Sequence, residues 1–238
     1  MAVVNLLYRD RVEINDYISV MIPKVRDVLE HEEEYYRLVL ALTAMPYDMM
    51  VQLDDLGIDF TEIDEYELFL LLFQGLRSED TSLIFGDLDL STFDTAANHK
   101  NHTVILKNED GIVIDRAIYS KIADTLRRIH HLEKTLKKPG NEEAKEYLLQ
   151  RTRKKLARRK NRKTMSELES LITGMVNAAE YKYNYETTLD LSIYQFNQSV
   201  HQIMNKVDYD NRMRGVYAGT IDAKRLSEDE LSWLPRNK

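Results

Sequence analysis

The sequence contains no cysteine, little glycine or proline, and no long hydrophobic run. The absence of cysteine among 238 residues excludes disulfides, thiol nucleophiles, iron–sulfur ligation and cysteine-based zinc sites. Eight Gly and four Pro are too few for a collagen-like or low-complexity chain. The longest strongly apolar stretch, residues 68–73, is far shorter than the ~20 residues of a membrane span. The first residues show no basic leader and no small-residue cleavage site, so we expect no export signal and no membrane partner.

Charge is distributed unevenly along a chain whose composition is that of a folded globular protein. Hydrophobic residues make up 43% and charged residues 31% of the sequence. Residues 1–100 carry 21 acidic and 7 basic side chains, whereas residues 101–238 carry 19 acidic and 26 basic ones. The formal net charge of -7 is therefore the sum of an acidic N-terminal part, residues 1–100, and a basic C-terminal part, residues 101–238. This asymmetry indicates either two differently charged domains or surfaces that meet oppositely charged neighbours, including copies of the same chain.

Two short β regions are predicted among helices. Residues 12–14 and 17–20 flank Asn15-Asp16, a pair that suits a tight hairpin, and residues 3–8 precede them as a further extended run. Residues 103–106 and 112–114 flank a loop that ends in Gly111 and predict a second hairpin near 103–116. Short apolar pieces between residues 82 and 93 predict one more strand.

Most of the remaining sequence has helical periodicity with recognisable start and stop signals. Thr61, Asn141, Ser166 and Ser192 are the predicted N-caps, and Gly57 and Gly219 are predicted stops. Residues 193–207 and 208–218 are expected as two successive helical stretches, and the apolar stripe of the helix after Asn141 ends at Leu149. We therefore predict an α+β fold, mainly helical, with two small β-hairpin elements. The predicted divisions are an acidic α+β N-terminal domain (1–95), a hairpin-plus-helix connector (96–140) and a helical C-terminal region with a basic helix (141–238).

The sequence shows no enzyme signature. It lacks the Gly-x-Ser-x-Gly elbow, the phosphate loop, the dinucleotide fingerprint and the His-Glu-x-x-His zinc motif, so we expect no enzymatic activity, no cofactor and no catalytic residue. Asp87 and Asp89 would share one face of a strand and form a weak Mg²⁺ or Ca²⁺ candidate. His99 with His102, and His130 with His131, are the two histidine clusters, and surface or core-edge positions are the favoured interpretation for them. We expect no metal site.

A strongly basic helical segment is the main candidate for binding. Nine of the thirteen residues in 151–163 are Lys or Arg and none is acidic. Three interpretations are open: docking on an acidic protein surface, contact with nucleic-acid phosphates, or a plain solvated helix. The candidate residues for the acidic partner or the nucleic acid are Arg151, Arg153, Lys154, Lys155, Arg158, Arg159, Lys160, Arg162 and Lys163.

Fourteen tyrosines, several of them in pairs or alternation, are typical of interfaces as well as of ordinary packing.

Two stretches carry a resemblance to a known group of proteins. The first contains VEINDYISV, IPKVRDVL, EEYYRLVLALTAMP and LDDLGIDFTEIDEYELF, and the second contains SIYQFNQSV and GVYAGTIDAK, followed by Ser232-Trp233-Leu234. Together they cover roughly half of the chain and resemble tail-morphogenesis proteins, including tail assembly chaperones, of tailed phages and prophages of Gram-positive bacteria. The strongly basic helix and the length depart from a small chaperone.

The resemblance implies a non-enzymatic morphogenesis factor or virion structural component. Its implied partners are other phage tail or virion proteins of the tape-measure or tail-tube type, and its implied location is the cytoplasm of the bacterial host or the virion. The charge layout adds a homo-oligomer as an expected partner, because an acidic N-terminal part and a basic C-terminal part allow head-to-tail contacts. A nucleic-acid-binding module that uses residues 151–163 is the alternative function.

Overall fold

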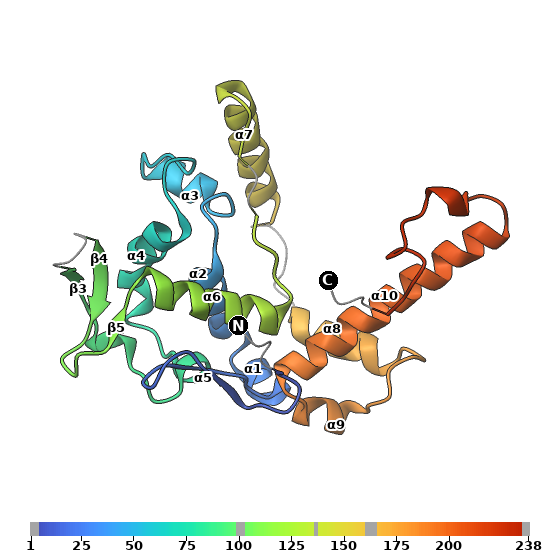
Figure 1. Ribbon diagram of the computed structural model, residues 1–238, viewed down its shortest axis with the longest axis horizontal. Helices are drawn as coiled ribbons and strands as arrows, with labels where there is room; N and C mark the ends of the chain where they lie inside the picture. The colour runs from blue at the N-terminus through green and yellow to red at the C-terminus, as the bar shows by residue number, and fades with distance from the viewer. Residues whose placement is uncertain (1–4, 99–102, 136–137, 160–165, 235–238) are drawn as a thin grey trace.

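A computed structural model describes residues 5–98, 103–135, 138–159 and 166–234. Helices predominate, and two small antiparallel sheets accompany them (Figure 1). In chain order the elements are β1 (Arg11–Glu13), β2 (Ser19–Met21), α1 (Val25–Glu30), α2 (Glu32–Thr43), α3 (Met50–Asp55), α4 (Glu65–Leu76), α5 (Ser82–Phe85), η1 (Leu90–Thr92), β3 (Asp94–Ala97), β4 (Val104–Lys107), β5 (Val113–Ile114), α6 (Arg116–His130), α7 (Glu142–Arg159), α8 (Glu167–Val176), α9 (Tyr185–Asp190), α10 (Ile193–Tyr217) and η2 (Ala223–Arg225). The predicted fold class, mainly helical α+β with two hairpins, is confirmed.

Both predicted hairpins form, and local side-chain chemistry explains the first. β1 pairs antiparallel with β2, with Val12 opposite Val20. The Asn15 side-chain oxygen accepts hydrogen bonds from the backbone N–H groups of Tyr17 and Ile18, at 2.9 and 2.7 Å, which closes the turn. In the second sheet β4 pairs with β5 as predicted, and β3 adds a third antiparallel strand.

One core connects the early and late parts of the chain. Its buried residues run from Leu6 to Val200, and helix α6 lies against both α2 and α10. Backbone hydrogen bonds join Val25 to Leu191 and Ile193 to Pro23, at 2.9 and 2.8 Å. The main core thus takes residues from all three predicted divisions of the chain.

A second, smaller cluster lies at one end of the body. It combines α3, its flanking loops and the start of α4 with one face of α7, and its buried members are Ala44, Met50, Val51, Leu53, Phe60, Leu68 and Leu149. Leu148 and Leu156 pack against it from the same helix, α7. The prediction that the apolar stripe stops at Leu149 is wrong, because Leu156, two turns later, still reaches this cluster.

Three further local predictions are corrected. Residues 82–93 form α5 and η1 instead of a strand, because Asp80 and Asp89 accept hydrogen bonds from the N–H groups of Ser82 and Ser91 and start these turns. The N-cap of α4 is Asp64, whose carboxylate accepts from the N–H groups of Tyr66 and Glu67. Thr61, the predicted N-cap, is not the cap of this helix, and its own N–H donates a hydrogen bond to the carboxylate of Asp59.

Residues 193–217 form one helix, α10, instead of two. Lys206 and Asp210 pair at 2.7 Å one turn apart across the predicted break, so the polar residues there support the helix.

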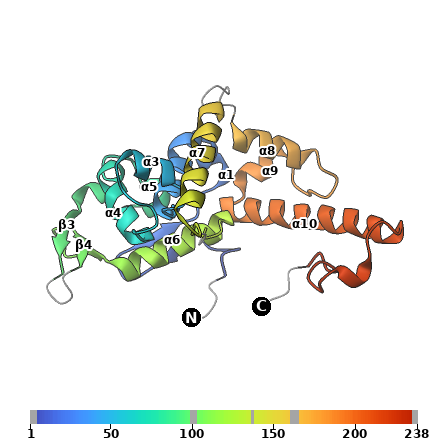
Figure 2. The ribbon, with the colours of Figure 1, turned by 90° about the horizontal axis from the view of Figure 1, so that it is seen from above.

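Figures 1 and 2 show α10 extending well beyond the body, with the C-terminal segment beside its far end.

Candidate interaction surfaces

The basic segment predicted to bind lies in α7, and one face of this helix is docked on the body. Leu149 is buried and Leu156 is half-buried against the cluster around α3. The ribbons of α3 and α7 lie side by side in Figures 1 and 2. Asn141 caps the helix, as predicted, by accepting a 2.8 Å hydrogen bond from the N–H of Ala144.

Ion pairs flank the apolar contact on this docked face. Lys145 Nζ lies 2.6 Å from the carboxylate of Asp59, and Arg153 lies 2.6 and 2.7 Å from Asp54 and Asp55. The hydrogen bonds from Lys145 and Thr61 lower the pKa of Asp59 to about 2. Hydrogen bonds to the two aspartates raise the pKa of Arg153. The acidic N-terminal part therefore binds one side of the basic helix within the same chain.

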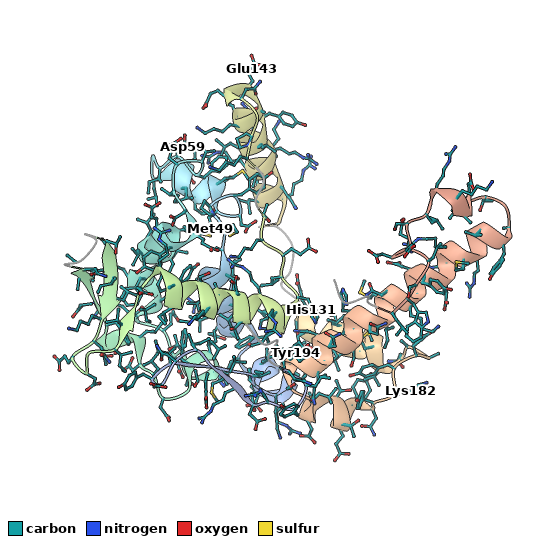
Figure 3. All side chains as sticks on the ribbon, in the orientation of Figure 1. Met49, Asp59, His131, Glu143, Lys182 and Tyr194 are labelled. Carbon is teal, nitrogen blue, oxygen red and sulfur yellow. The ribbon has the colours of Figure 1, made fainter. Side chains whose placement is uncertain are left out.

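The opposite face of α7 is exposed. Tyr147, Arg151, Lys154, Lys155 and Arg158 are exposed and spaced three and four residues apart, so they form one stripe along the helix, which we call the basic face. Within the part of the chain that the structure describes, these four cations make no ion pair. Side chains project from α7 on the side away from α3 (Figure 3). Arg153 therefore faces the body and is paired with aspartates, whereas the cations next to it in sequence face solvent.

The other predicted members of the basic segment cannot be placed in the same way. The helix continues to Arg159, whose side chain lies outside the described residues. Lys160, Arg162 and Lys163 also lie outside them.

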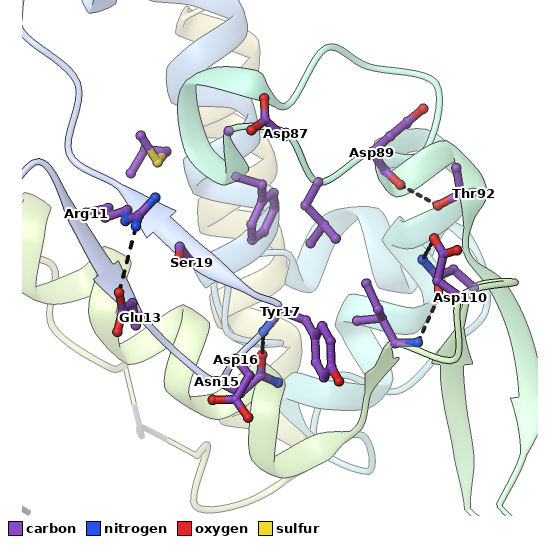
Figure 4. A pocket seen from close by; sticks show the side chains of 16 residues that line it. Arg11, Glu13, Asn15, Asp16, Tyr17, Ser19, Asp87, Asp89, Thr92 and Asp110 are labelled. Carbon is purple, nitrogen blue, oxygen red and sulfur yellow. Dashed lines mark hydrogen bonds and ion pairs between the residues drawn. The ribbon is translucent and has the colours of Figure 1, made fainter.

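A second surface, which sequence reasoning did not assemble, is acidic. The β1–β2 turn, the loop after α5 and the β4–β5 turn enclose an open groove with a volume of about 770 Å³ (Figure 4). Its carboxylates are Glu13, Asp16, Asp87, Asp89 and Asp110, and all five are exposed. Among the described residues that line it, Arg11 is the single cation, 3.8 Å from Glu13. We call this surface the acidic groove.

The acidic groove also carries apolar groups. Tyr17 is 72% exposed at the β1–β2 turn, and Met21 and Leu88 are half-buried in the lining. An exposed ring among carboxylates offers both stacking and hydrogen bonding to a cationic side chain. Hairpin and turn signals locate each segment in the sequence, but nothing local predicts that the three segments meet.

Asp87 and Asp89, the weak metal candidate, lie in a loop where Asp89 has a structural role. The Asp89 carboxylate accepts a 2.8 Å hydrogen bond from the N–H of Ser91, and hydrogen bonds from Ser91 lower its pKa. The two residues lie in a loop between short helices, so the strand that would align them is not present there. Among the described residues no group of three His, Asp or Glu side chains could hold a metal ion.

The histidine pair His130-His131 has a structural setting at the end of α6. His130 lies 2.9 Å from the hydroxyl of Tyr35, and burial, with help from His131, lowers its pKa to about 4. His131 has a left-handed backbone with φ of 52° and stacks on His201 of α10 with ring centroids 4.9 Å apart. His130 is half-buried and His131 is exposed, so the predicted surface or core-edge position is confirmed for this pair. His99 and His102 lie outside the described residues.

The third surface is the arm formed by α10 and the C-terminal segment. The buried residues of α10 are Ile193, Phe196 and Val200, all in its first third, and Met204 beyond them is 60% exposed. The C-terminal segment folds back along the helix: Gln202 donates a 2.8 Å hydrogen bond to the carbonyl of Trp233, and Arg212 donates one of 2.9 Å to that of Glu230. The arm is thus a separate substructure attached to the body through its first turns.

Comparison with known proteins identifies a relation for this region. Residues 159–238 match the family described as the second domain of YomV. YomV is a Bacillus prophage protein, so the family is phage-associated, and the match supports the predicted phage association without specifying tail assembly. The YomV-like region comprises α8, α9, α10 and the C-terminal segment, and α7 with its basic face precedes it.

Neither a curated protein nor a solved structure matches the chain. In the described residues, no helix combines the length and the apolar character needed to cross a membrane.

Proposed function

We propose that this protein is a non-enzymatic morphogenesis factor or structural component of a phage or prophage, and that it acts in tail assembly by binding other proteins. The observation that carries the proposal is the match of residues 159–238 to the second domain of YomV. The resemblance of both ends of the sequence to tail-morphogenesis proteins supplies the finer assignment to the tail. The partners would be proteins of the tape-measure or tail-tube type, met in the host cytoplasm or retained in the virion.

The surfaces of the molecule support a binding role. The basic face of α7, the acidic groove and the projecting arm are three separate exposed features with distinct chemistry. Protein interfaces are enriched in aromatic residues and tend to carry complementary charge. Exposed tyrosines and charged surfaces of both signs occur here.

Deletion of the coding sequence from the phage or prophage tests this function. After induction, electron microscopy of the lysate should show filled heads with absent or misassembled tails, and expression of the intact protein in trans should restore them. Normal, infectious particles in the deletion strain would refute a role in tail assembly.

The alternative function, nucleic-acid binding, uses the same four exposed cations of α7. Neutralisation of phosphates by Lys and Arg makes such binding steeply salt-dependent and sequence-tolerant. It predicts that nucleic acid co-purifies with the protein at low salt and raises its 260/280 absorbance ratio.

A further inference from the structure

We propose that the basic face of α7 docks in the acidic groove of a second copy of this chain, so that copies associate head to tail. This inference deepens the proposed function by naming one partner, the protein itself. The argument rests on charge, on position in the fold and on the exposed aromatic rings.

The two surfaces match in charge. The basic face presents four exposed cations, Arg151, Lys154, Lys155 and Arg158. Five carboxylates and one guanidinium leave the acidic groove with a net charge of −4. Unit charges of opposite sign at contact distance attract, and complementary patches steer two proteins together and fix their relative orientation.

The groove has room for the stripe, and each surface carries an exposed aromatic ring. From Tyr147 to Arg158 the stripe spans eleven helical steps, about 17 Å at the rise of 1.5 Å per residue. A groove of about 770 Å³ has room for the side chains of one such helix face. Tyr147 is 64% exposed on one surface and Tyr17 is 72% exposed on the other, and each ring can cover a guanidinium or a lysine stem of the opposite copy.

The positions of the two surfaces in the fold favour a contact between two copies over a contact within one chain. Figure 1 shows α7 standing at one end of the body, whereas β1, β2 and α5, which border the groove, lie at the opposite end. The basic face therefore cannot reach the groove of its own chain. Two different surfaces at opposite ends of one molecule give a heterologous contact, which builds a ring or a stack of copies instead of a closed pair.

The docked face of α7 supports this use of the helix. Leu149, Leu156 and Arg153 fix the helix on the body, so its exposed face is held in one orientation before any partner arrives. A preorganised surface loses less conformational freedom on binding.

Two neutralised variants test the proposal. The basic-face variant carries Arg151→Gln, Lys154→Gln, Lys155→Gln and Arg158→Gln, and the groove variant carries Asp16→Asn, Asp87→Asn and Asp110→Asn. Glu13 and Asp89 stay unchanged because they hold Arg11 and the N–H of Ser91. A control variant carries Arg9→Gln, Lys121→Gln, Lys224→Gln and Arg225→Gln, which removes the same number of exposed cations elsewhere. Circular dichroism and the unfolding midpoint establish that each variant is folded.

Light scattering gives the mass of each protein at low and at moderate salt. The Debye length falls from roughly 30 Å at 0.01 M salt to about 8 Å at 0.15 M, so the wild type should form oligomers at low salt that dissociate as salt rises. Each single variant should be monomeric, with self-association at least roughly 30-fold weaker from the loss of several exposed pairs, and the control should behave as the wild type.

The mixture of the two variants gives the sharpest result. The basic-face variant keeps an intact groove and the groove variant keeps an intact basic face, so an equimolar mixture should form a dimer and nothing larger. A mixture that stays monomeric would overturn the proposal. So would a monomeric wild type with a raised 260/280 absorbance ratio at low salt that the basic-face variant lacks, because nucleic acid would then occupy the basic face. Tail morphology in the deletion strain does not depend on either result, so the proposed function is judged separately.

Discussion

The buried ion pairs of Arg127 allow the effect of its removal on the free energy of unfolding to be predicted. Its side chain is 6% exposed and joins three helices. It donates to the carbonyl of Thr43 at the end of α2 and to the Glu65 carboxylate in the first turn of α4, at 2.8 and 2.9 Å, and it pairs with Asp124 of α6 at 3.1 Å. Removal of one partner from a buried ion pair costs about 3–5 kcal/mol, because the other charge stays buried and unpaired.

Arg127→Ala should fall at the lower end of that range. Glu65 remains 21% exposed and keeps Lys134 at 3.1 Å, so its charge is partly compensated. We expect a loss of about 3 kcal/mol in the free energy of unfolding, including about 1 kcal/mol for the lost hydrogen bond to Thr43. Arg26→Ala is the matched control, because Arg26 pairs with Asp190 at 2.5 Å while both side chains are about half exposed.

Urea denaturation followed by circular dichroism measures both variants against the wild type. The exposed pair of Arg26 should contribute less than about 1 kcal/mol. Equal losses for Arg127→Ala and Arg26→Ala would refute the argument that burial decides the cost. A normal circular dichroism spectrum in the absence of denaturant shows that the comparison is between folded proteins.

Three further outcomes are expected. Leu149→Ala should lower the free energy of unfolding by about 2 kcal/mol and detach α7 from α3. Trypsin should then cleave within residues 151–159 faster than in the wild type. Unchanged cleavage would contradict the docking of this helix. The pKa of His130 is about 4 in the folded protein and about 6.5 in the unfolded chain, so the unfolded chain binds a proton first as the pH falls. The free energy of unfolding should therefore fall by up to about 3 kcal/mol between pH 6.5 and pH 4. His130→Gln should remove that part of the pH dependence in urea titrations at pH 7 and 4.5, and an unaltered slope would rule it out. Gly86→Ala should cost about 1–2 kcal/mol in thermal unfolding, because Gly86 has φ of +64°, a backbone conformation that L side chains rarely adopt. An unchanged melting temperature would contradict this backbone strain.

Local hydrogen bonding and turn geometry made much of the fold predictable from the sequence. Asn141, Ser166 and Ser192 each accept a backbone N–H three residues ahead, so these helix starts depend on residues adjacent in the chain. Gly57 and Gly219 have positive φ at the predicted stops. The same locality explains the first hairpin, whose turn is closed by Asn15.

The strand predicted between residues 82 and 93 failed for a related reason. Short apolar runs have no clear period, and turns started by Asp80 and Asp89 outweighed the strand propensity of the apolar residues between them. The single helix α10 was missed because Lys206 and Asp210, polar residues at the expected break, pair along the helix surface.

The basic segment shows what only the tertiary structure decided. The sequence by itself determined that a helix dense in cations follows Asn141 and that the acidic charge lies in the first hundred residues. It could not separate Arg153, which is bound to Asp54 and Asp55, from Arg151 and Lys154, which are exposed and form no ion pair with any residue that the structure describes. That division follows from the apolar contacts of Leu149 and Leu156 with α3, because packing between distant segments sets the rotation of a helix and hence which of its charges face solvent.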